Sequence, residues 1–186
     1  MPFVHTDFPG LFVFEPVVFK DDRGYFFESY NQQLFQKNGT DFKFVQDNQS
    51  HSKYGVVRGL HYQLNPRSQT KLVRVLKGNI LDVAVDIRKG SPTFGKSYCI
   101  ELSDENKKQL LVPKGFAHGF AVLSETADVM YKCDEFYNKE CEAGIIYNDN
   151  RLAIDWKVPA GKIVVSAKDL DLPTFEKHIG NFVFEG

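Results

Sequence analysis

The sequence has few cysteines and no long apolar run, and these two absences restrict the class of protein. Three cysteines occur among 186 residues, Cys99, Cys133 and Cys141, and none belongs to a CxxC pair. An odd number without paired spacing argues against the disulfide framework of a small secreted domain. No apolar run approaches membrane-spanning length, and the start, MPFVHTDFPG, lacks the charged and apolar regions of a signal peptide. We therefore expect a soluble, cytoplasmic protein with no membrane partner.

An excess of basic charge is also absent. The chain has 23 Lys and Arg residues against 24 Asp and Glu residues, which gives a formal net charge of −1, and the basic residues are scattered along the sequence. Because there is no basic arm or stripe, a nucleic acid partner is not expected. The length predicts one domain over residues 1–186 with a real hydrophobic core. Residues 174–186 are expected to form a loosely held tail.

Short apolar runs separated by turn signals dominate the sequence. Turn signals such as Asp21 to Gly24 and Lys89 to Pro92 recur at close intervals, and 17 phenylalanines are spread between them. This pattern is typical of an all-β sandwich or barrel. Alternation in KLVRVLKGNILDVAVDI (71–87) predicts a β-hairpin around Gly78-Asn79. Helical signals are few, and NQQLFQKNG (31–39) is predicted to form a short helix.

Charged residues at alternating strand positions are the exceptions in this pattern. Lys71 shares a strand face with Val73 and Val75, and Asp82 shares one with Ala84. If such a face points into the sandwich, the interior contains a wet pocket, because unpaired buried charge is costly. The alternative is that the face is the solvated outside of the sheet, and for Asp82 the sequence leaves both interpretations open.

Two histidines raise the question of a metal site. His61 in GLHYQ and His118 in PKGFAHGF are spaced as in the two motifs of the cupin-like β-barrel, and many cupins bind metal. Their usual ligands are an H-x-H pair, a carboxylate and one further histidine, but here Gln63 occupies the second position of the pair. Lys71 stands where an acidic ligand would be wanted, and its positive charge opposes a divalent cation. We therefore predict a barrel without metal.

Several motifs follow one another along most of the chain, namely FKDDRGYFFESY (19–30), FVQDNQS (44–50), VVRGLHYQ (56–63), QTKLVRVLKGNILDVAVDIR (69–88), PKGFAHGF (113–120), YKCDEFYNKECEAG (131–144) and SAKD (166–169). Together they resemble dTDP-4-dehydrorhamnose 3,5-epimerase, from about the tenth residue to beyond Asp169. The resemblance implies a cupin-type jelly-roll with a few short peripheral helices and a homodimer that exchanges N-terminal strands. It also implies that no cofactor is used and that the substrate is dTDP-4-dehydro-6-deoxy-D-glucose, inverted at C3 and C5 on the way to dTDP-L-rhamnose.

Inversion of a carbon next to a ketone requires a base, an acid and a group that stabilises the enolate. The imidazole of His61, with an ordinary pKa of about 6.5, suits the base, and a carboxylate on its second nitrogen would improve it. Sequence alone leaves Asp169 and Asp171 open as that carboxylate, and the resemblance selects Asp169. By resemblance, Lys71 faces the enolate oxygen and Tyr131 is the acid. Without the resemblance, Tyr131 would be interpreted as an ordinary strand aromatic.

The remaining matched positions are predicted to hold the nucleotide and the sugar. Arg23 and Arg58 suit the pyrophosphate, because guanidinium presents a planar fork of donors to phosphate oxygens. The resemblance places Tyr137 against thymine, with Phe26 shaping that pocket. His118 is ambiguous: it either hydrogen-bonds near the reacting sugar oxygen or is a vestige of a cupin metal site. The other positions that the resemblance assigns to the substrate are Glu28, Gln46, Asp47, Asn48, Glu142 and Lys168.

Three functions follow as hypotheses. The first is the 3,5-epimerase itself, an isomerase of nucleotide sugars. The second is a relative on the same scaffold that inverts only C3 or only C5 of another nucleotide-linked 4-ketosugar. The third is a cupin that is non-catalytic or depends on a metal. The base, the acid and the lysine are needed by both the first and the second, so these residues do not separate them.

Overall fold

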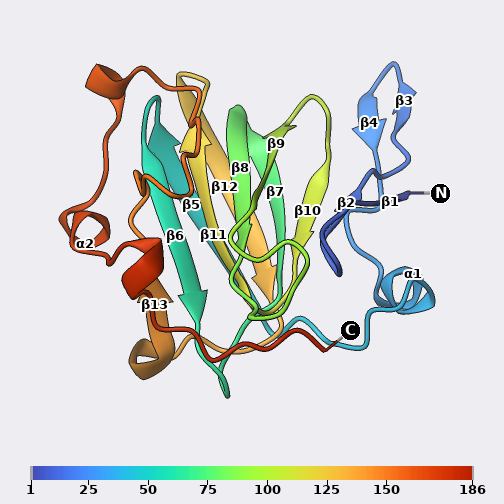
Figure 1. Cartoon of the computed structure of the whole chain (residues 1–186). Helices are drawn as coiled ribbons and strands as arrows, with labels where there is room; N and C mark the ends of the chain where they lie inside the picture. The colour runs from blue at the N-terminus through green and yellow to red at the C-terminus, as the bar shows by residue number, and fades with distance from the viewer. Residues whose placement is uncertain (1, 186) are drawn as a thin grey trace.

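Two antiparallel sheets face each other in the computed structural model, which describes residues 2–185, and they form a jelly-roll barrel of the cupin type (Figure 1). The six-stranded sheet has the spatial order β1 (Phe3–His5), β2 (Phe12–Phe14), β10 (Gln109–Val112), β7 (Lys71–Lys77), β12 (Thr126–Cys133) and β5 (Gln46–Lys53). The five-stranded sheet has the order β13 (Glu142–Gly144), β6 (Val57–Gln63), β11 (Phe116–Val122), β8 (Asn79–Asp86) and β9 (Ser97–Ser103).

The elements outside the barrel are short. The strands β3 (Phe19–Asp21) and β4 (Gly24–Phe26) form a separate hairpin, and the α-helices are α1 (Gln32–Lys37) and α2 (Ala167–Leu170). Three 3-10 turns cover Lys139–Cys141, Ala160–Lys162 and Phe175–Lys177. The predicted all-β class with a few short peripheral helices is therefore confirmed. None of the helices in residues 2–185 is long and apolar enough to cross a membrane.

The predicted hairpin around Gly78 is wrong, although both of its strands exist. The strand β7 pairs with β10 and β12 in one sheet, whereas β8 pairs with β9 and β11 in the other. The chain crosses between the sheets at Gly78, where φ is +84° and a Cβ atom would lie 2.2 Å from the Thr126 carbonyl oxygen. Glycine fits this corner because it has no Cβ. Alternating apolar residues suit two facing sheets as well as they suit a hairpin, so the pattern alone did not separate the two arrangements.

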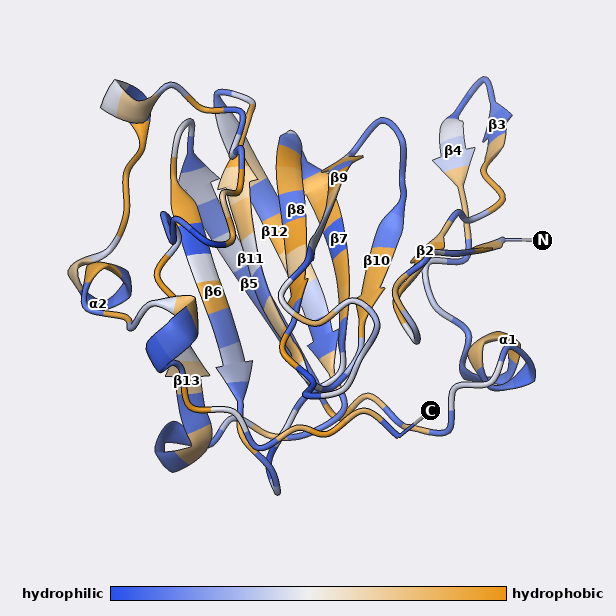
Figure 2. Ribbon diagram, viewed as in Figure 1, coloured by the Kyte–Doolittle hydropathy of each residue, from blue (hydrophilic) through white to orange (hydrophobic). Residues whose placement is uncertain are grey.

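The space between the sheets holds a hydrophobic core built from alternate residues of the facing strands. Val73 and Val75 of β7 share it with Ala84 of β8 and Phe120 of β11, and all four are buried. Figure 2 shows the matching bands of hydrophobic and hydrophilic residues along the central strands. Asp82 is also completely buried, so its strand face is not the solvated outside that the sequence left open. A charged group therefore lies inside the barrel.

The C-terminal segment packs against the outer face of the five-stranded sheet, in contrast to the loosely held tail that we expected. Phe175 and Phe182 are 2% and 6% exposed and belong to the core on that face. The Tyr62 hydroxyl donates a hydrogen bond to the Ile179 carbonyl oxygen at 2.6 Å. Buried rings and paired backbone groups hold residues 174–185 in place, because both would be lost to water if the segment detached.

An aromatic cluster covers part of the outer face of the six-stranded sheet. Phe3, Phe14 and Phe35 form its centre, and Phe35 is contributed by α1. The side chain of Asn31 accepts a hydrogen bond from the Leu34 backbone and caps the start of the helix. The helix predicted near residues 31–39 is therefore confirmed, and it anchors the N-terminal region to the barrel.

Candidate active site

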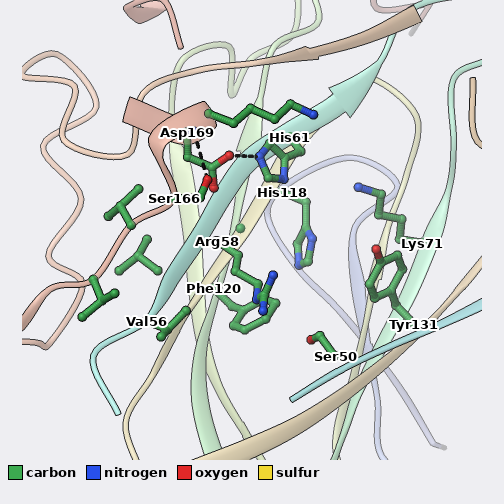
Figure 3. A pocket seen from close by; sticks show the side chains of 15 residues that line it. Ser50, Val56, Arg58, His61, Lys71, His118, Phe120, Tyr131, Ser166 and Asp169 are labelled. Atoms are coloured by element: carbon green, nitrogen blue, oxygen red, sulfur yellow. Dashed lines mark hydrogen bonds and ion pairs between the residues drawn. The ribbon is translucent and has the colours of Figure 1, made fainter. Parts of the chain in front are cut away.

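A cavity of about 500 Å³ lies between the two sheets beside α2 (Figure 3). All four side chains that the sequence assigns to catalysis line it, and they come from β6, β7, β12 and α2. The predicted residues that line the cavity are Arg58, His61, Lys71, His118, Tyr131, Lys168 and Asp169. Segments far apart in the sequence thus converge on one cavity.

His61 and Asp169 form a hydrogen-bonded pair at the wall of this cavity. The His61 Nε2 atom lies 2.7 Å from Asp169 Oδ1. Asp169 is 4% exposed, and its second carboxylate oxygen accepts a hydrogen bond from the Gly59 backbone at 3.3 Å. Ser166 caps the N-terminus of α2 and accepts from the Asp169 backbone. Asp171, which sequence alone left as an alternative, is exposed.

The charge of Asp169 decides how the His61 ring is protonated. Burial acts to raise the pKa of Asp169, but the hydrogen bonds from His61, Gly59 and Ser166 outweigh it and lower the pKa from its ordinary value. Asp169 is then an anion near neutral pH and can only accept hydrogen bonds. The neutral His61 ring therefore carries its hydrogen on Nε2, which leaves Nδ1 unprotonated. An unprotonated ring nitrogen is the atom that a general base needs.

A β-bulge in β6 brings Arg58 and His61 to the same side of the strand. In register with β11, His61 pairs with His118 and Arg58 pairs with Phe120, so three steps along β6 match two along β11. Without the extra residue, side chains three positions apart would point to opposite faces. Gly59 lies within the bulge at φ +117°, and a Cβ atom there would be 2.6 Å from the backbone of β11. The bulge explains how both side chains reach the cavity.

Lys71 and Tyr131 lie side by side on neighbouring strands of the six-stranded sheet. The Lys71 Nζ atom is 5.8 Å from the centre of the Tyr131 ring. Within residues 2–185, no carboxylate lies within ion-pair distance of the Lys71 ammonium. Burial lowers the pKa of Lys71 and raises that of Tyr131, so the tyrosine keeps its phenolic proton at neutral pH. A phenolic proton donor and the amino group of a lysine thus face the same cavity.

A second histidine and carboxylate pair lies deeper in the barrel. The His118 Nε2 atom is 2.7 Å from Asp82 Oδ1, and both side chains are buried. Gln63, at the place of a second metal-binding histidine, donates from Nε2 to the Arg67 carbonyl and accepts from the Asn138 backbone. Among residues 2–185, no three His, Cys, Asp or Glu side chains gather as a metal site. The metal-free barrel stays a prediction.

The predicted sugar-nucleotide contacts on β5 and near β13 form a connected group beside the cavity. Glu142 accepts a hydrogen bond from the Tyr137 hydroxyl at 2.9 Å and forms an ion pair with Lys168 at 2.7 Å. Gln46 accepts from the Tyr137 backbone and donates to the Asn48 side chain. These residues therefore lie together, although of them only Lys168 lines the cavity itself.

Asp47 is separated from this group by strand alternation. Its carboxylate forms an ion pair with Lys132 at 3.0 Å, and about half of the Asp47 side chain is exposed. Neighbouring residues of a strand point to opposite faces, so Asp47 lies on the face of β5 opposite Gln46 and Asn48. Its predicted substrate contact would require the backbone of β5 rather than this side chain.

Three predicted substrate residues lie away from the cavity. Arg23, Phe26 and Glu28 belong to the hairpin of β3 and β4 or follow it, and in Figure 1 this hairpin is on the side of the barrel opposite α2. Phe26 is 71% exposed, and the Arg23 guanidinium donates to the Asp21 carboxylate at 2.6 Å. Within one chain, these residues do not join the other predicted contacts.

The site geometry and the comparison with known proteins lead to the same family. The sequence profile described as dTDP-4-dehydrorhamnose 3,5-epimerase matches residues 5–177. The chain belongs to this family. A dTDP-4-dehydrorhamnose 3,5-epimerase of Shigella flexneri is 51% identical over 172 residues, which cover 92% of this chain and 94% of that protein.

Solved epimerase structures share the fold. The dTDP-4-dehydrorhamnose 3,5-epimerase of Elizabethkingia anophelis aligns with a TM-score of 0.90 and 53% identity, covering 94% of this chain and 96% of that one. A dTDP-6-deoxy-D-glucose-3,5-epimerase of Legionella pneumophila, in complex with dTDP-4-keto-L-rhamnose, aligns with a TM-score of 0.90 and 46% identity. That alignment covers 94% of this chain and 93% of the other. The enzyme is therefore an isomerase by family.

Sequence reasoning missed some residues that build this epimerase site. Ser52 is buried and accepts a hydrogen bond from Arg58 Nε at 3.0 Å, which orients the guanidinium. Ser50 lines the cavity, and its hydroxyl is buried without a hydrogen-bond partner. The sequence predicts no role for Asp82, whose Oδ1 atom lies 2.7 Å from His118 Nε2. Strand alternation in FVQDNQSHS places Gln46, Asn48, Ser50 and Ser52 on one face, and this signal was available in the sequence.

Proposed function

We propose that this protein converts dTDP-4-dehydro-6-deoxy-D-glucose to dTDP-4-dehydro-L-rhamnose, a step in the biosynthesis of dTDP-L-rhamnose. The observation that carries the proposal is the pair of His61 and Asp169, whose cavity also holds Lys71 and Tyr131. Family membership indicates the class of substrate. The side chains provide the base, the cation and the acid that inversion next to a ketone requires.

At each carbon, the proposed reaction removes one proton and adds another on the opposite face. Nδ1 of His61 removes the proton from C3 or C5, and Asp169 stabilises the imidazolium that results. The electron pair of the broken C–H bond shifts into the carbonyl group, so the C4 oxygen becomes an enolate facing the Lys71 ammonium. The hydroxyl of Tyr131 then gives its proton to the opposite face of the carbon, and the enolate returns to a ketone. His61 releases its proton to solvent and Tyr131 takes one up from solvent, and this reset is needed before the second carbon is inverted and again before the next turnover.

The nucleotide part of the substrate is assigned to the rim of the cavity. Arg58, oriented by Ser52, binds the pyrophosphate through its free guanidinium nitrogens. The ring of Tyr137 stacks on thymine, and Glu142 and Lys168 fix the neighbouring polar groups. His118 hydrogen-bonds the sugar near the reacting oxygen. Tight binding of dTDP alone is expected, because most of these contacts do not involve the sugar.

A homodimer is part of the proposal. Arg23, Phe26 and Glu28 fall on predicted substrate positions but lie away from the cavity of their own chain. Exposed aromatic rings on the same hairpin, with Phe19 at 63% and Phe26 at 71%, are suited to burial against a second copy. Exchange of N-terminal strands would carry these residues to the partner's cavity. A location in the cytoplasm remains a prediction from the sequence.

Product analysis by NMR in deuterated water tests the function. The purified protein is incubated with dTDP-4-dehydro-6-deoxy-D-glucose, and the expected result is deuterium at both C3 and C5 in a product of L configuration. Deuterium at only one carbon would instead identify an epimerase of a single centre. Absence of exchange at both carbons would reject an epimerase altogether.

The same assay tests the proposed independence from metal and cofactor. The protein is dialysed against a chelator, its metal content is measured, and the epimerisation rate is compared before and after. We expect an unchanged rate without any added cofactor, because all the proposed proton transfers use side chains of the chain itself. Loss of activity that returns with an added metal would favour the metal-dependent cupin.

A further inference from the structure

Asp82 is a buried carboxylate behind the cavity that the proposed reaction does not use. It lies on β8 and is completely shielded from solvent. Its Oδ1 atom lies 2.7 Å from His118 Nε2, but its Oδ2 atom is buried with no hydrogen-bond partner. A buried anion that is only half satisfied is costly to a folded protein. A buried polar group that lacks a hydrogen-bond partner often has a role in the neighbouring functional site.

The charge of Asp82 acts on Lys71 at a distance. Burial lowers the pKa of Lys71, and the negative charges of Asp82 and Glu142 oppose this effect. Cys133 and Tyr131 also lie near the Lys71 side chain, and burial raises the pKa of Cys133 to about 11 and that of Tyr131 above its ordinary value. Both are therefore neutral near pH 7. Asp82 and Glu142 are the two carboxylates whose charge favours the ammonium.

The same carboxylate fixes the ring of His118. As an anion, Asp82 accepts a hydrogen bond, so His118 carries a hydrogen on Nε2 and its neutral ring has an unprotonated Nδ1. His118 lines the cavity and pairs in register with His61 (Figure 3). Nε2 of His118 is thus hydrogen-bonded to Asp82 inside the barrel, and Nδ1 remains available to the substrate.

We propose that Asp82 is a positioning residue: its buried carboxylate accepts the hydrogen bond of His118 Nε2 and thereby holds the ring with Nδ1 available to the substrate. The inference rests on the proposed epimerase function, because the sugar of that substrate is the group that His118 Nδ1 would contact. The half-satisfied carboxylate thus costs folding stability, and its role is to preorganise the site.

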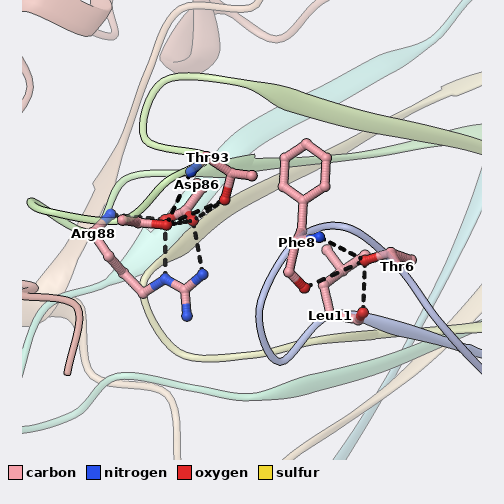
Figure 4. Close-up of polar contacts among 7 residues, drawn as sticks. Thr6, Phe8, Leu11, Asp86, Arg88 and Thr93 are labelled. Atoms are coloured by element: carbon pink, nitrogen blue, oxygen red, sulfur yellow. Dashed lines mark hydrogen bonds and ion pairs between the residues drawn. The ribbon is translucent and has the colours of Figure 1, made fainter. Parts of the chain in front are cut away.

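Asp86 provides a matched control on the same strand. It is also completely buried, but it accepts hydrogen bonds from the Arg88 guanidinium, the Ser91 hydroxyl and the Thr93 hydroxyl, all within 3.0 Å (Figure 4). It does not line the cavity. Replacement of either aspartate by asparagine removes one buried charge with little change in volume. The two variants therefore separate an effect on the site from an effect on the fold.

The first experiment compares Asp82→Asn with Asp86→Asn. For Asp82→Asn we expect kcat to fall about a hundredfold, the scale for loss of one oriented electrostatic group, with dTDP affinity within about threefold of the wild type. Its urea midpoint should not fall, because the lost charge was incompletely satisfied. For Asp86→Asn we expect a lower urea midpoint and a retained kcat. An Asp82→Asn variant with unchanged kcat, or one destabilised as much as Asp86→Asn, overturns the proposal.

The second experiment reads the His118 ring directly in the wild-type protein. Nitrogen-15 NMR of labelled histidines, assigned with His118→Gln, should show the hydrogen of His118 on Nε2 and an unprotonated Nδ1 at pH values where the ring is neutral. The opposite tautomer overturns the proposal, even if Asp82→Asn does not fold. This measurement needs no turnover. An inactive wild type with the expected tautomer would therefore reject the proposed function and not the orientation of His118.

Discussion

His61 Nε2 lies 2.7 Å from Asp169 Oδ1, although the two residues are 108 positions apart in the sequence. His61 belongs to a central strand of the barrel, whereas Asp169 lies in a short helix of the segment that packs beside it. The proposed base is therefore completed only when this segment is in place.

The carboxylate should matter for the rate more than for binding. We expect Asp169→Asn to slow epimerisation at least about a hundredfold, because the imidazolium loses its counter-ion and the tautomer is no longer fixed. Affinity for dTDP, measured by calorimetry, should remain nearly intact. Asp171→Asn is the control, since Asp171 is exposed two residues away and should keep full activity. His61→Ala should abolish deuterium exchange at both C3 and C5, and equal losses of dTDP affinity in the His61 and Asp169 variants would mark them as binding residues.

Removal of the lysine should leave a folded but nearly inactive protein. We expect Lys71→Ala to raise the activation barrier by about 3 kcal/mol, the typical effect of losing one stabilising group at an oxyanion. Stability to urea should not fall, because a buried ammonium without an ion-pair partner is lost. Lys77→Ala, at the exposed end of the same strand, is the control for the assay. Normal turnover by Lys71→Ala would remove the lysine from the mechanism.

The tyrosine should affect the return of the proton. We expect Tyr131→Phe to permit some deuterium exchange at the sugar carbons without full inversion, since His61 still removes the proton while the donor on the opposite face is missing. NMR of the recovered sugar in deuterated water measures both quantities. Tyr98→Phe is the control, because Tyr98 also packs against the barrel core but does not line the cavity. Full epimerase activity in Tyr131→Phe would exclude tyrosine as the acid.

The N-terminal hairpin should act on the partner's cavity. One variant carries His61→Ala, and a second carries Arg23→Ala with Phe26→Ala; each alone is expected to be inactive or nearly so. After subunits are mixed through denaturation and refolding, random pairing should restore about a quarter of the wild-type sites, because half of the dimers contain one intact cavity. A mixture no more active than its components, or a monomer by sedimentation, would contradict strand exchange.

The buried Asp86 should make stability depend on acid pH. Burial acts to raise the pKa of Asp86, but hydrogen bonds from Arg88, Ser91 and Thr93 lower it below the ordinary 3.8. Its contribution is therefore fully present above pH 3.8 and is lost as the pH falls through the lower, folded-state value. We expect Asp86→Asn to cost about 3 kcal/mol of unfolding free energy at pH 7, because the Arg88 charge loses its partner. In urea unfolding, the difference in unfolding free energy between the wild type and Asp86→Asn should become smaller below about pH 4. A difference that does not change with pH would contradict this prediction.

The sequence predicted the strands and most of the site better than it predicted their connections. Alternation located β7 and β8, but it described a hairpin where the chain changes sheets at Gly78. The alternation of apolar residues shows only which face of a strand is apolar, and a hairpin and a crossing between two sheets bury the same face. For Asp82, nothing in the sequence distinguished a position on the outer face from one in the interior. That choice depends on which sheet lies opposite, which is a property of the whole topology.

The bulge at Gly59 makes the spacing of Arg58 and His61 informative about strand shape. In a regular strand, side chains on the same face are separated by an even number of positions. An odd spacing between two residues that line the same cavity, such as Arg58 and His61, therefore implies an extra residue in the strand. We expect deletion of Gly59 to restore a regular strand and to turn His61 toward the outer core, away from the cavity. Removal of one residue would thus move the proposed base out of the cavity by turning it to the other face of the strand, although every predicted site residue would still be present in the sequence.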